Sequence, residues 1–171
     1  MSSRKRKNGL DKSNGAAKPS GAAMRPFSRS LPMQLMRARE AVMRRFRPHL
    51  AAHGFSDQQW RIVRALNDAG SMEIGALAAQ CQIHAASLSR MLPTLARLGL
   101  IARKSRREDQ RRVVVSITPK GRAVFRTAAP ESEEIYAAME REIGPEKLRD
   151  LYRLLDEVIE SLPVNGAPRQ E

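Results

Sequence analysis

Four arginines stand close together near the middle of the chain, in the stretch KSRREDQRRVVVSITPKG from 104 to 121. These are Arg106, Arg107, Arg111 and Arg112, and they flank an acidic pair that ends in Asp109. A guanidinium is always charged and presents a planar fork of donors, so such a cluster is suited to phosphates, carboxylates and base edges. We expect Asp109 to hold one guanidinium in a bidentate pair, which orients its neighbour in advance.

The charge of the whole chain also predicts an anionic partner for this region. The sequence has 31 Lys and Arg against 18 Asp and Glu, a net charge of +13. Residues 84–122 hold ten basic and two acidic residues, whereas residues 123–171 hold six and eleven. Net charge is an argument about partners and not about fold, and here it favours nucleic acid.

Length and composition predict one mainly α-helical domain. The chain has 171 residues, of which 42% are apolar but only 4% aromatic.

No apolar run reaches the roughly 18 residues that span a bilayer, so we expect a soluble cytoplasmic protein. A single Cys81 excludes an intrachain disulfide. The sequence shows no glycine-rich phosphate loop, no paired carboxylates in an apolar setting, and no nucleophile with its base at a recognisable spacing. We therefore expect that the protein is not an enzyme and uses no cofactor.

The elements that position the arginines begin after a basic tail, residues 1–25, which we expect to be disordered. A helix from Pro32 carries apolar residues on several faces and should kink or end at Pro48. Ser56 to Gln59 form a capping box that opens a second helix, with Trp60 facing inward. That helix should stop before Gly70.

Two short helices should then pack at an angle. Their inward residues are Ile74, Leu77, Ala78 and Cys81 on the first, and Leu88, Met91, Leu92, Leu95 and Leu98 on the second. The spacing predicts a helix-turn-helix. Gln82 stands in the turn where glycine is common, and Pro93 lies inside the second helix.

A hairpin should follow, with strands at Leu100 to Lys104 and Arg112 to Ile117. Thr118 and Pro119 then begin a new helix as N-cap and first residue. The last helix carries one apolar stripe, composed of Leu148, Leu151, Leu155, Val158, Ile159 and Leu162. The fold class is therefore mainly α, a winged helix-turn-helix with a two-stranded β-wing. Its DNA-binding lobe spans about 56–117, within a domain from 26 to 162, and a disordered tail covers 163–171.

Several motifs resemble the MarR family of bacterial transcription regulators. They are Asp109-x-Arg111, Ser116-Ile-Thr-Pro-Lys-Gly121, Ser87-Leu-Ser-Arg90 and Leu98-Gly-Leu-Ile101. The resemblance implies an obligate homodimer built by the first and last two helices, which offers two winged helices to a palindromic double-stranded DNA operator. Carried over by position, Ser87 and Arg90 should contact base edges, Ser89 a phosphate or base, and the hairpin arginines the minor groove or its phosphates.

The N-terminal segment narrows the resemblance. Met24-Arg-Pro-Phe-Ser-Arg-Ser-Leu-Pro32, Arg37-Ala-Arg-Glu-Ala-Val-Met43 and Phe46-Arg-Pro48 are similar to the branch represented by the repressor of homoprotocatechuate degradation. This branch implies a repressor of aromatic catabolism that a hydroxylated aromatic or heteroaromatic carboxylate releases from DNA. The candidate effector-binding residues are Ser28, Arg29, Ser30, His49, His53, Trp60 and Arg64.

Other interpretations remain open at this point. The wing arginines also suit a solvated hairpin, and the serines an ordinary helix surface. Trp60 also suits a core, and the two histidines also suit helix capping or solvent. His49 and His53, four residues apart, form half of a metal site, but no third ligand is evident, so no metal is predicted. Two rival functions are a nonspecific architectural nucleic-acid binder and a regulator that responds to oxidation of Cys81.

Overall fold

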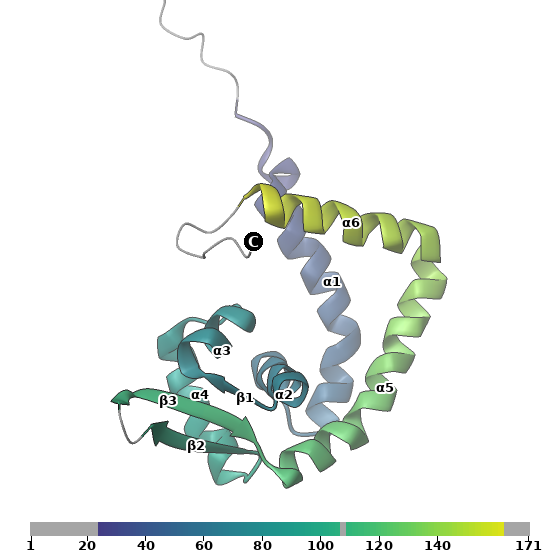
Figure 1. Ribbon diagram of the computed structural model, residues 1–171. Helices are drawn as coiled ribbons and strands as arrows, with labels where there is room; N and C mark the ends of the chain where they lie inside the picture. The colour runs from purple at the N-terminus through teal and green to yellow at the C-terminus, as the bar shows by residue number, and fades with distance from the viewer. Residues whose placement is uncertain (1–23, 107–108, 163–171) are drawn as a thin grey trace, which may run out of the picture. The chain divides into compact units, whose positions relative to one another are not determined.

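The computed structural model describes residues 24–106 and 109–162, and the side chains of 105–112 lie outside that description (Figure 1). The chain divides into two compact units, which meet in the sequence between Ala38 and Arg39. The tails predicted at 1–25 and 163–171 lie almost wholly outside the described residues. Among the described residues, no helix is long and apolar enough to cross a membrane.

The first unit contains a short 3-10 helix, η1 (Phe27–Arg29), and the start of α1 (Leu31–Ala52). Ser30 Oγ donates to the carbonyl oxygen of Phe27 at 3.0 Å, and the side chain of Gln34 donates to the carbonyl of Ser28. These local contacts order the approach to α1.

Helix α1 continues through Pro48 to Ala52, so of the two outcomes expected at Pro48, a kink or an end, the end is wrong. Proline removes one backbone donor, which leaves the carbonyl of the residue four positions earlier without its helical partner. Pro48 and that residue, Arg44, are both exposed, so water can satisfy the carbonyl.

Helix α2 (Asp57–Ala69) begins as predicted. The Ser56 hydroxyl accepts from the backbone of Gln59 while the Gln59 side chain accepts from the backbone of Ser56. The helix ends at Gly70, whose φ of 74° lies in the left-handed region that favours glycine. Its buried residues are Trp60, Ile62, Val63 and Leu66.

Helices α3 (Ile74–Gln80) and α4 (Ala85–Arg97) form the predicted helix-turn-helix. Leu77, Ala78, Cys81 and Leu88 are buried between them. Gln82 takes a left-handed φ of 48° in the turn, the conformation for which glycine is the usual residue. The prediction that Leu98 faces inward is wrong: α4 ends at Arg97, and Leu98 is exposed as its C-cap.

The β-structure is larger than predicted. Strands β2 (Ile101–Arg106) and β3 (Asp109–Ile117) replace the shorter expected pair, and β1 (Ser71–Glu73) adds a third antiparallel strand in the order β1-β3-β2. The predicted two-stranded wing, β2 with β3, is present, and β1 extends it to a three-stranded sheet. Ser71 pairs with Ser116, and Ile101 with Ile117.

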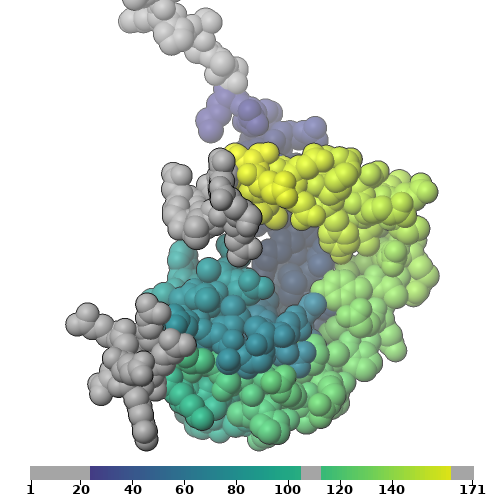
Figure 2. Space-filling view, viewed as in Figure 1, coloured from purple at the N-terminus to yellow at the C-terminus, as the bar shows by residue number. Residues whose placement is uncertain are grey.

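Strand β3 leads directly into α5 (Pro119–Ile143), and α6 (Pro145–Ser161) follows (Figure 1). Thr118 caps α5 as predicted, because its hydroxyl accepts from the backbone of Gly121. Helix α6 has no buried residue, and its atoms, in yellow, form part of the surface that Figure 2 shows. Its exposed large apolar residues are Leu151, Tyr152, Leu154 and Ile159, with Leu162 just beyond its end.

Candidate functional site

The outer face of α4 presents the predicted base-reading residues to solvent. Ser89 and Arg90 are exposed and Ser87 is half-buried. Arg90 Nη2 donates to Ser87 Oγ at 3.4 Å, which holds the two side chains together. The opposite face is fixed in the core by Leu88, Leu92 and Leu95, so the polar face has a defined orientation.

Pro93 lies inside α4 and is exposed. Its missing N–H leaves the carbonyl of Ser89, which is also exposed, without a helical partner. The break in the hydrogen-bond ladder therefore occurs in solvent, which explains why the helix tolerates it.

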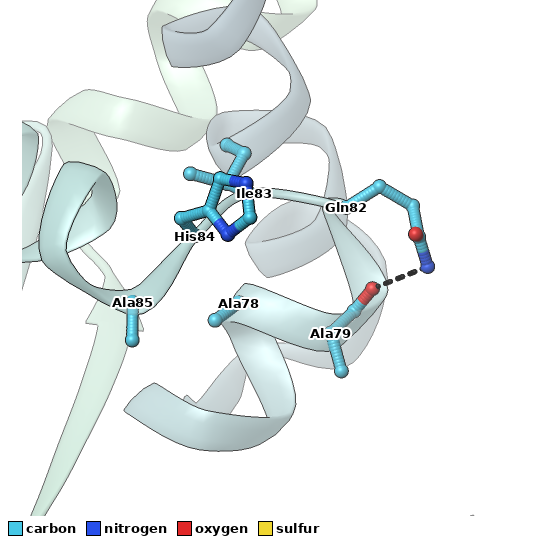
Figure 3. Close-up of a pocket in the computed structure, with 6 residues that line it drawn as sticks. All are labelled: Ala78, Ala79, Gln82, Ile83, His84 and Ala85. Atoms are coloured by element: carbon cyan, nitrogen blue, oxygen red, sulfur yellow. Dashed lines mark hydrogen bonds between the residues drawn. The ribbon is translucent and has the colours of Figure 1, made fainter. Parts of the chain in front are cut away.

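The turn that precedes α4 forms a shallow hollow of about 400 Å³ (Figure 3). Its lining consists of Ala78, Ala79, Gln82, Ile83, His84 and Ala85. The Gln82 side chain donates to the carbonyl of Ala79 at 3.0 Å, and His84 makes no side-chain capping bond to α4. Small side chains leave the first turn of α4 open, and the partial positive charge of a helix N-terminus favours an approaching phosphate.

The arginines of the hairpin lie around its tip, where β2 ends and β3 begins. Arg106 belongs to β2, and Asp109, Arg111 and Arg112 belong to β3. Backbone pairing sets Arg106 opposite Asp109. Arg107 lies outside the described residues, as do the side chains of the other four, so the roles assigned to them stay predictions.

A cavity of about 270 Å³ lies between α1, α2 and α5, within the second unit. Its walls are Arg39, Val42, Met43, Phe46, Leu50, Asp57, Trp60, Arg61, Arg64 and Tyr136. Three arginines and one aspartate give it an excess of positive charge, while the other walls are mostly apolar or aromatic. The cavity is therefore suited to a small, flat anion.

Two of these arginines are already oriented. Arg64 Nη1 donates to the Tyr136 hydroxyl at 3.0 Å, and the guanidinium lies 5.9 Å from the centre of the Tyr136 ring. Arg61 Nη1 donates to the carbonyl of Cys81 at 2.6 Å, but its Nε is buried without a hydrogen-bond partner. An unsatisfied buried donor costs about 1–3 kcal/mol, so Arg61 would gain from an anion in the cavity.

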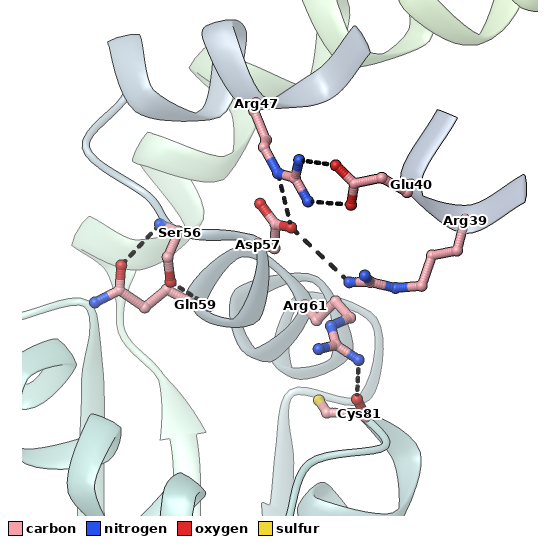
Figure 4. Close-up of polar contacts among 8 residues, drawn as sticks. All are labelled: Arg39, Glu40, Arg47, Ser56, Asp57, Gln59, Arg61 and Cys81. Atoms are coloured by element: carbon pink, nitrogen blue, oxygen red, sulfur yellow. Dashed lines mark hydrogen bonds and ion pairs between the residues drawn. The ribbon is translucent and has the colours of Figure 1, made fainter. Parts of the chain in front are cut away.

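Asp57 is held by two arginines of α1 (Figure 4). Its Oδ2 lies 3.4 Å from Arg47 Nε and 3.8 Å from Arg39 Nη2. Arg47 also binds both carboxylate oxygens of Glu40, and these hydrogen bonds lower the pKa of Glu40. The network ties the start of α2 to α1 beside the cavity.

Of the predicted effector-binding residues, the structure brings only Trp60 and Arg64 to this cavity. Ser28, Arg29 and Ser30 belong to the first unit, at η1 and the start of α1. His49 and His53 face α5 instead, where His49 is buried against Ser132 and Glu131. Trp60 is both core and cavity wall, and its ring stacks on Phe125 at 5.4 Å between ring centres.

The sequence interpretation missed four polar members of the cavity, which are Arg39, Asp57, Arg61 and Tyr136. A signal for two of them was present. Asp57, Trp60, Arg61 and Arg64 follow the spacing i, i+3, i+4, i+7, which places them on one face of a helix. Tyr136 lies on α5 and Arg39 on α1, and only the packing of these helices against α2 brings the two residues to the cavity.

Cys81 is buried, with 3% of its surface exposed, and burial raises the pKa of its thiol. Reactive cysteines are exposed thiolates with a lowered pKa. The structure therefore disfavours the redox-responsive alternative.

Comparison with known proteins points to one family. A sequence model described as the MarR family matches residues 55–113. The homoprotocatechuate degradative operon repressor of Escherichia coli is 39% identical over 142 residues, which cover 83% of this chain and 93% of that protein. The crystal structure of transcriptional regulator PA4135 is 40% identical, with a TM-score of 0.75, and the match covers 78% of this chain and 98% of that one. The structure of NadR in complex with 4-hydroxyphenylacetate is 36% identical, with a TM-score of 0.68 and coverage of 80% and 97%.

Proposed function

The chain belongs to the MarR family, and from that premise we propose that it is a ligand-responsive transcriptional repressor. It binds a pseudo-palindromic operator as a homodimer, and a small hydroxylated aromatic or heteroaromatic carboxylate releases it. The observation that carries the DNA-binding part is the exposed polar face of α4, backed by buried leucines and followed by an arginine-rich hairpin.

The two parts of the lobe suit different grooves of DNA. The major groove admits a helix, and its donors and acceptors distinguish all four base pairs. The narrow minor groove attracts arginine. Arg90 is our assignment for a base contact, since it is exposed and positioned by Ser87.

We expect Arg90→Ala to weaken operator binding by about 10- to 100-fold, because a good bidentate base contact is worth about 1–3 kcal/mol. Binding to random duplex should fall much less, since phosphate contacts are sequence-independent. Fluorescence anisotropy with both duplexes at one salt concentration measures this. Arg149→Ala on α6, also an exposed arginine, is the matched control and should bind normally. If Arg90→Ala weakens binding to the operator and to the random duplex equally, Arg90 contacts phosphates and not base edges.

Dimerisation is supported by α6. A helix with no buried residue and several exposed large apolar side chains is unstable alone in water unless a partner covers it. In a two-fold dimer the same patch serves both subunits, and the symmetry requires a pseudo-palindromic operator with half-sites about one helical turn apart.

The ligand-responsive part is supported by the arginine-lined cavity. NadR, at 36% identity, has been crystallised with 4-hydroxyphenylacetate, a small phenolic acid. In this chain Arg61 and Arg64 can bind a carboxylate, and the Tyr136 hydroxyl can bind either the carboxylate or a ring hydroxyl. Trp60 and Phe46 supply flat apolar walls.

Two separate tyrosine-to-phenylalanine substitutions, one in the cavity and one outside it, test whether the cavity binds the effector. We expect Tyr136→Phe to weaken binding of 4-hydroxyphenylacetate, or of the best acid in a screen of hydroxylated aromatic acids, by about tenfold. The reason is that one hydrogen bond involving a charged group is worth about 1.5–3 kcal/mol. Tyr152→Phe, on exposed α6, is the matched control and should change nothing. Isothermal titration calorimetry provides the affinities. Should both variants bind like wild type, the cavity is not the effector site.

Release from DNA follows from a shift of populations. A ligand bound between α1, α2 and α5 favours the arrangement it fits best, in which the two recognition helices no longer match successive major grooves. By thermodynamic reciprocity, bound operator must lower ligand affinity by the same factor. The rival, a nonspecific architectural binder, predicts no such coupling.

A further inference from the structure

A second polar cluster joins α1 to α5, outside the arginine-lined cavity. It contains His49 and His53 of α1 with Glu131 and Ser132 of α5. His49 is only 3% exposed, so its imidazole must be satisfied by protein groups or by a bound species. The DNA-binding, dimer and cavity roles proposed above do not use this cluster, although His49 and His53 were candidate effector-binding residues from the sequence.

The two nitrogens of His49 differ in how well they are satisfied. Nε2 lies 2.9 Å from Ser132 Oγ in a hydrogen bond. Nδ1 lies 2.7 Å from a carboxylate oxygen of Glu131, but this approach does not have hydrogen-bond geometry, and Nδ1 is buried without a hydrogen-bond partner. A short distance alone does not make a hydrogen bond, because the bond weakens steeply when misaligned. A cation between the two atoms would satisfy both.

His53 brings a second nitrogen to the same place. It follows His49 by four residues, so both rings lie on one face of α1, with their centres 4.8 Å apart. His53 Nδ1 lies 3.1 Å from the carbonyl oxygen of His49. A carbonyl only accepts, so Nδ1 carries the proton and Nε2 keeps its lone pair. In metal sites a ligating histidine commonly donates its other N–H to a carbonyl in this way.

We infer that His49, His53 and Glu131 bind a divalent transition-metal ion of the Zn²⁺ class and thereby clamp α1 to α5. One ligand atom from each residue lies within 4.8 Å of the others. Zinc bonds to nitrogen are about 2.0–2.1 Å long, which makes a tetrahedral edge about 3.3 Å. Ligand atoms that lie as much as 4.8 Å apart must therefore close by about 1.5 Å, while His49 Nδ1 and the Glu131 oxygen, 2.7 Å apart, must separate by about 0.6 Å. His53 is half-buried and Glu131 is exposed, so both can move, and both leave an entry path for the ion.

The donor set decides the class of ion. Two imidazole nitrogens and one carboxylate oxygen suit Zn²⁺ and its borderline neighbours better than Mg²⁺ or Ca²⁺, which prefer all-oxygen sites. Three protein ligands leave one tetrahedral position for water. When Nδ1 of His49 binds the metal, Nε2 carries the proton and donates to Ser132 Oγ, 2.9 Å away, so Ser132 positions His49 in this site.

The test uses the untagged full chain, freed of metal with a chelator that is then removed, and titrated with Zn²⁺ by calorimetry. We expect one ion per chain and a rise in Tm with zinc, because an ion that binds only the folded state stabilises it. His53→Gln and Glu131→Gln should each weaken Zn²⁺ binding at least about tenfold and abolish the rise in Tm. Both residues are at least partly exposed, so these variants should fold, which circular dichroism checks.

Two matched controls come from the chain itself. His84→Gln removes the remaining histidine, and Glu134→Gln removes an exposed carboxylate of α5 three residues beyond Glu131. Both should bind Zn²⁺ as wild type does. The inference is overturned if the wild type binds no zinc, if His53→Gln and Glu131→Gln bind as tightly as wild type, or if His84→Gln abolishes binding. The cluster would then be a purely hydrogen-bonded contact between the helices. Because the readouts are zinc affinity and Tm, they do not depend on DNA or an aromatic acid.

Discussion

Replacing both Leu151 and Ile159 by glutamate is expected to dissociate the proposed dimer and to weaken operator binding by at least about 10³-fold, which is the lower end of the ratio of specific to nonspecific affinity. The two side chains are 44% and 68% exposed on α6 in the single chain. In the proposed dimer they are covered by the partner. Glutamate there would bury an uncompensated charge, which proteins avoid at considerable cost.

Light scattering during gel filtration measures the mass of the particle, and anisotropy measures the operator affinity. The control is Arg149→Gln with Arg153→Gln, which changes the charge of α6 by the same amount but keeps its apolar residues. The control should remain dimeric. A glutamate variant that stays dimeric and binds normally would show that α6 is not at the interface.

Gly121→Ala is expected to lower the free energy of unfolding by about 3 kcal/mol or more, at the upper end for overpacking. Gly121 is buried in the first turn of α5, and a Cβ there would lie 2.1 Å from the carbonyl oxygen of Leu100 and 2.8 Å from Ile117 Cγ1. The Leu100 carbonyl cannot move away easily, because it accepts from both the backbone and the hydroxyl of Thr118, each at 3.1 Å.

Chemical denaturation at a fixed protein concentration provides the comparison, since the stability of a dimer depends on concentration. Gly75→Ala in α3 is the control, because a Cβ there meets nothing within 4 Å. Alanine inside a helix should then be neutral or stabilising by up to about 1 kcal/mol. If Gly121→Ala unfolds within about 1 kcal/mol of wild type, the contact between β2 and α5 is looser than the structure shows.

Local signals in the sequence predicted much of the fold. Ser56 with Gln59, and Thr118 with Pro119, identified two helix starts because capping depends only on residues within one turn. Strand β1 was missed because three residues make a strand only by pairing with β3, about 40 positions away in the sequence. Leu98 continued the apolar spacing of α4, but the helix ends one residue earlier, so the spacing no longer sets its direction.

The site depended more on packing. Trp60 and Arg64, selected from residue type, line the cavity, but their role in effector binding stays a prediction. The faces of α1 could not be assigned before its neighbours were known. His49 and His53 turned out to face α5, where Glu131 and Ser132 meet them. The third ligand of the proposed metal site, Glu131, lies 78 residues after His53, with no local pattern to connect them. The helical repeat in a sequence shows which residues share a face of one helix. Which residues of two different helices meet is decided only by tertiary packing.

The central claim is that this chain recognises one DNA sequence and not DNA in general. The most direct test is a competition experiment in which a labelled duplex from upstream of the chain's own gene is displaced by unlabelled copies of itself or by random duplex of equal length, at physiological salt. We expect the specific duplex to compete at least about 10³-fold better. Equal competition by the random duplex would contradict the account and leave a nonspecific basic DNA-binding protein in its place.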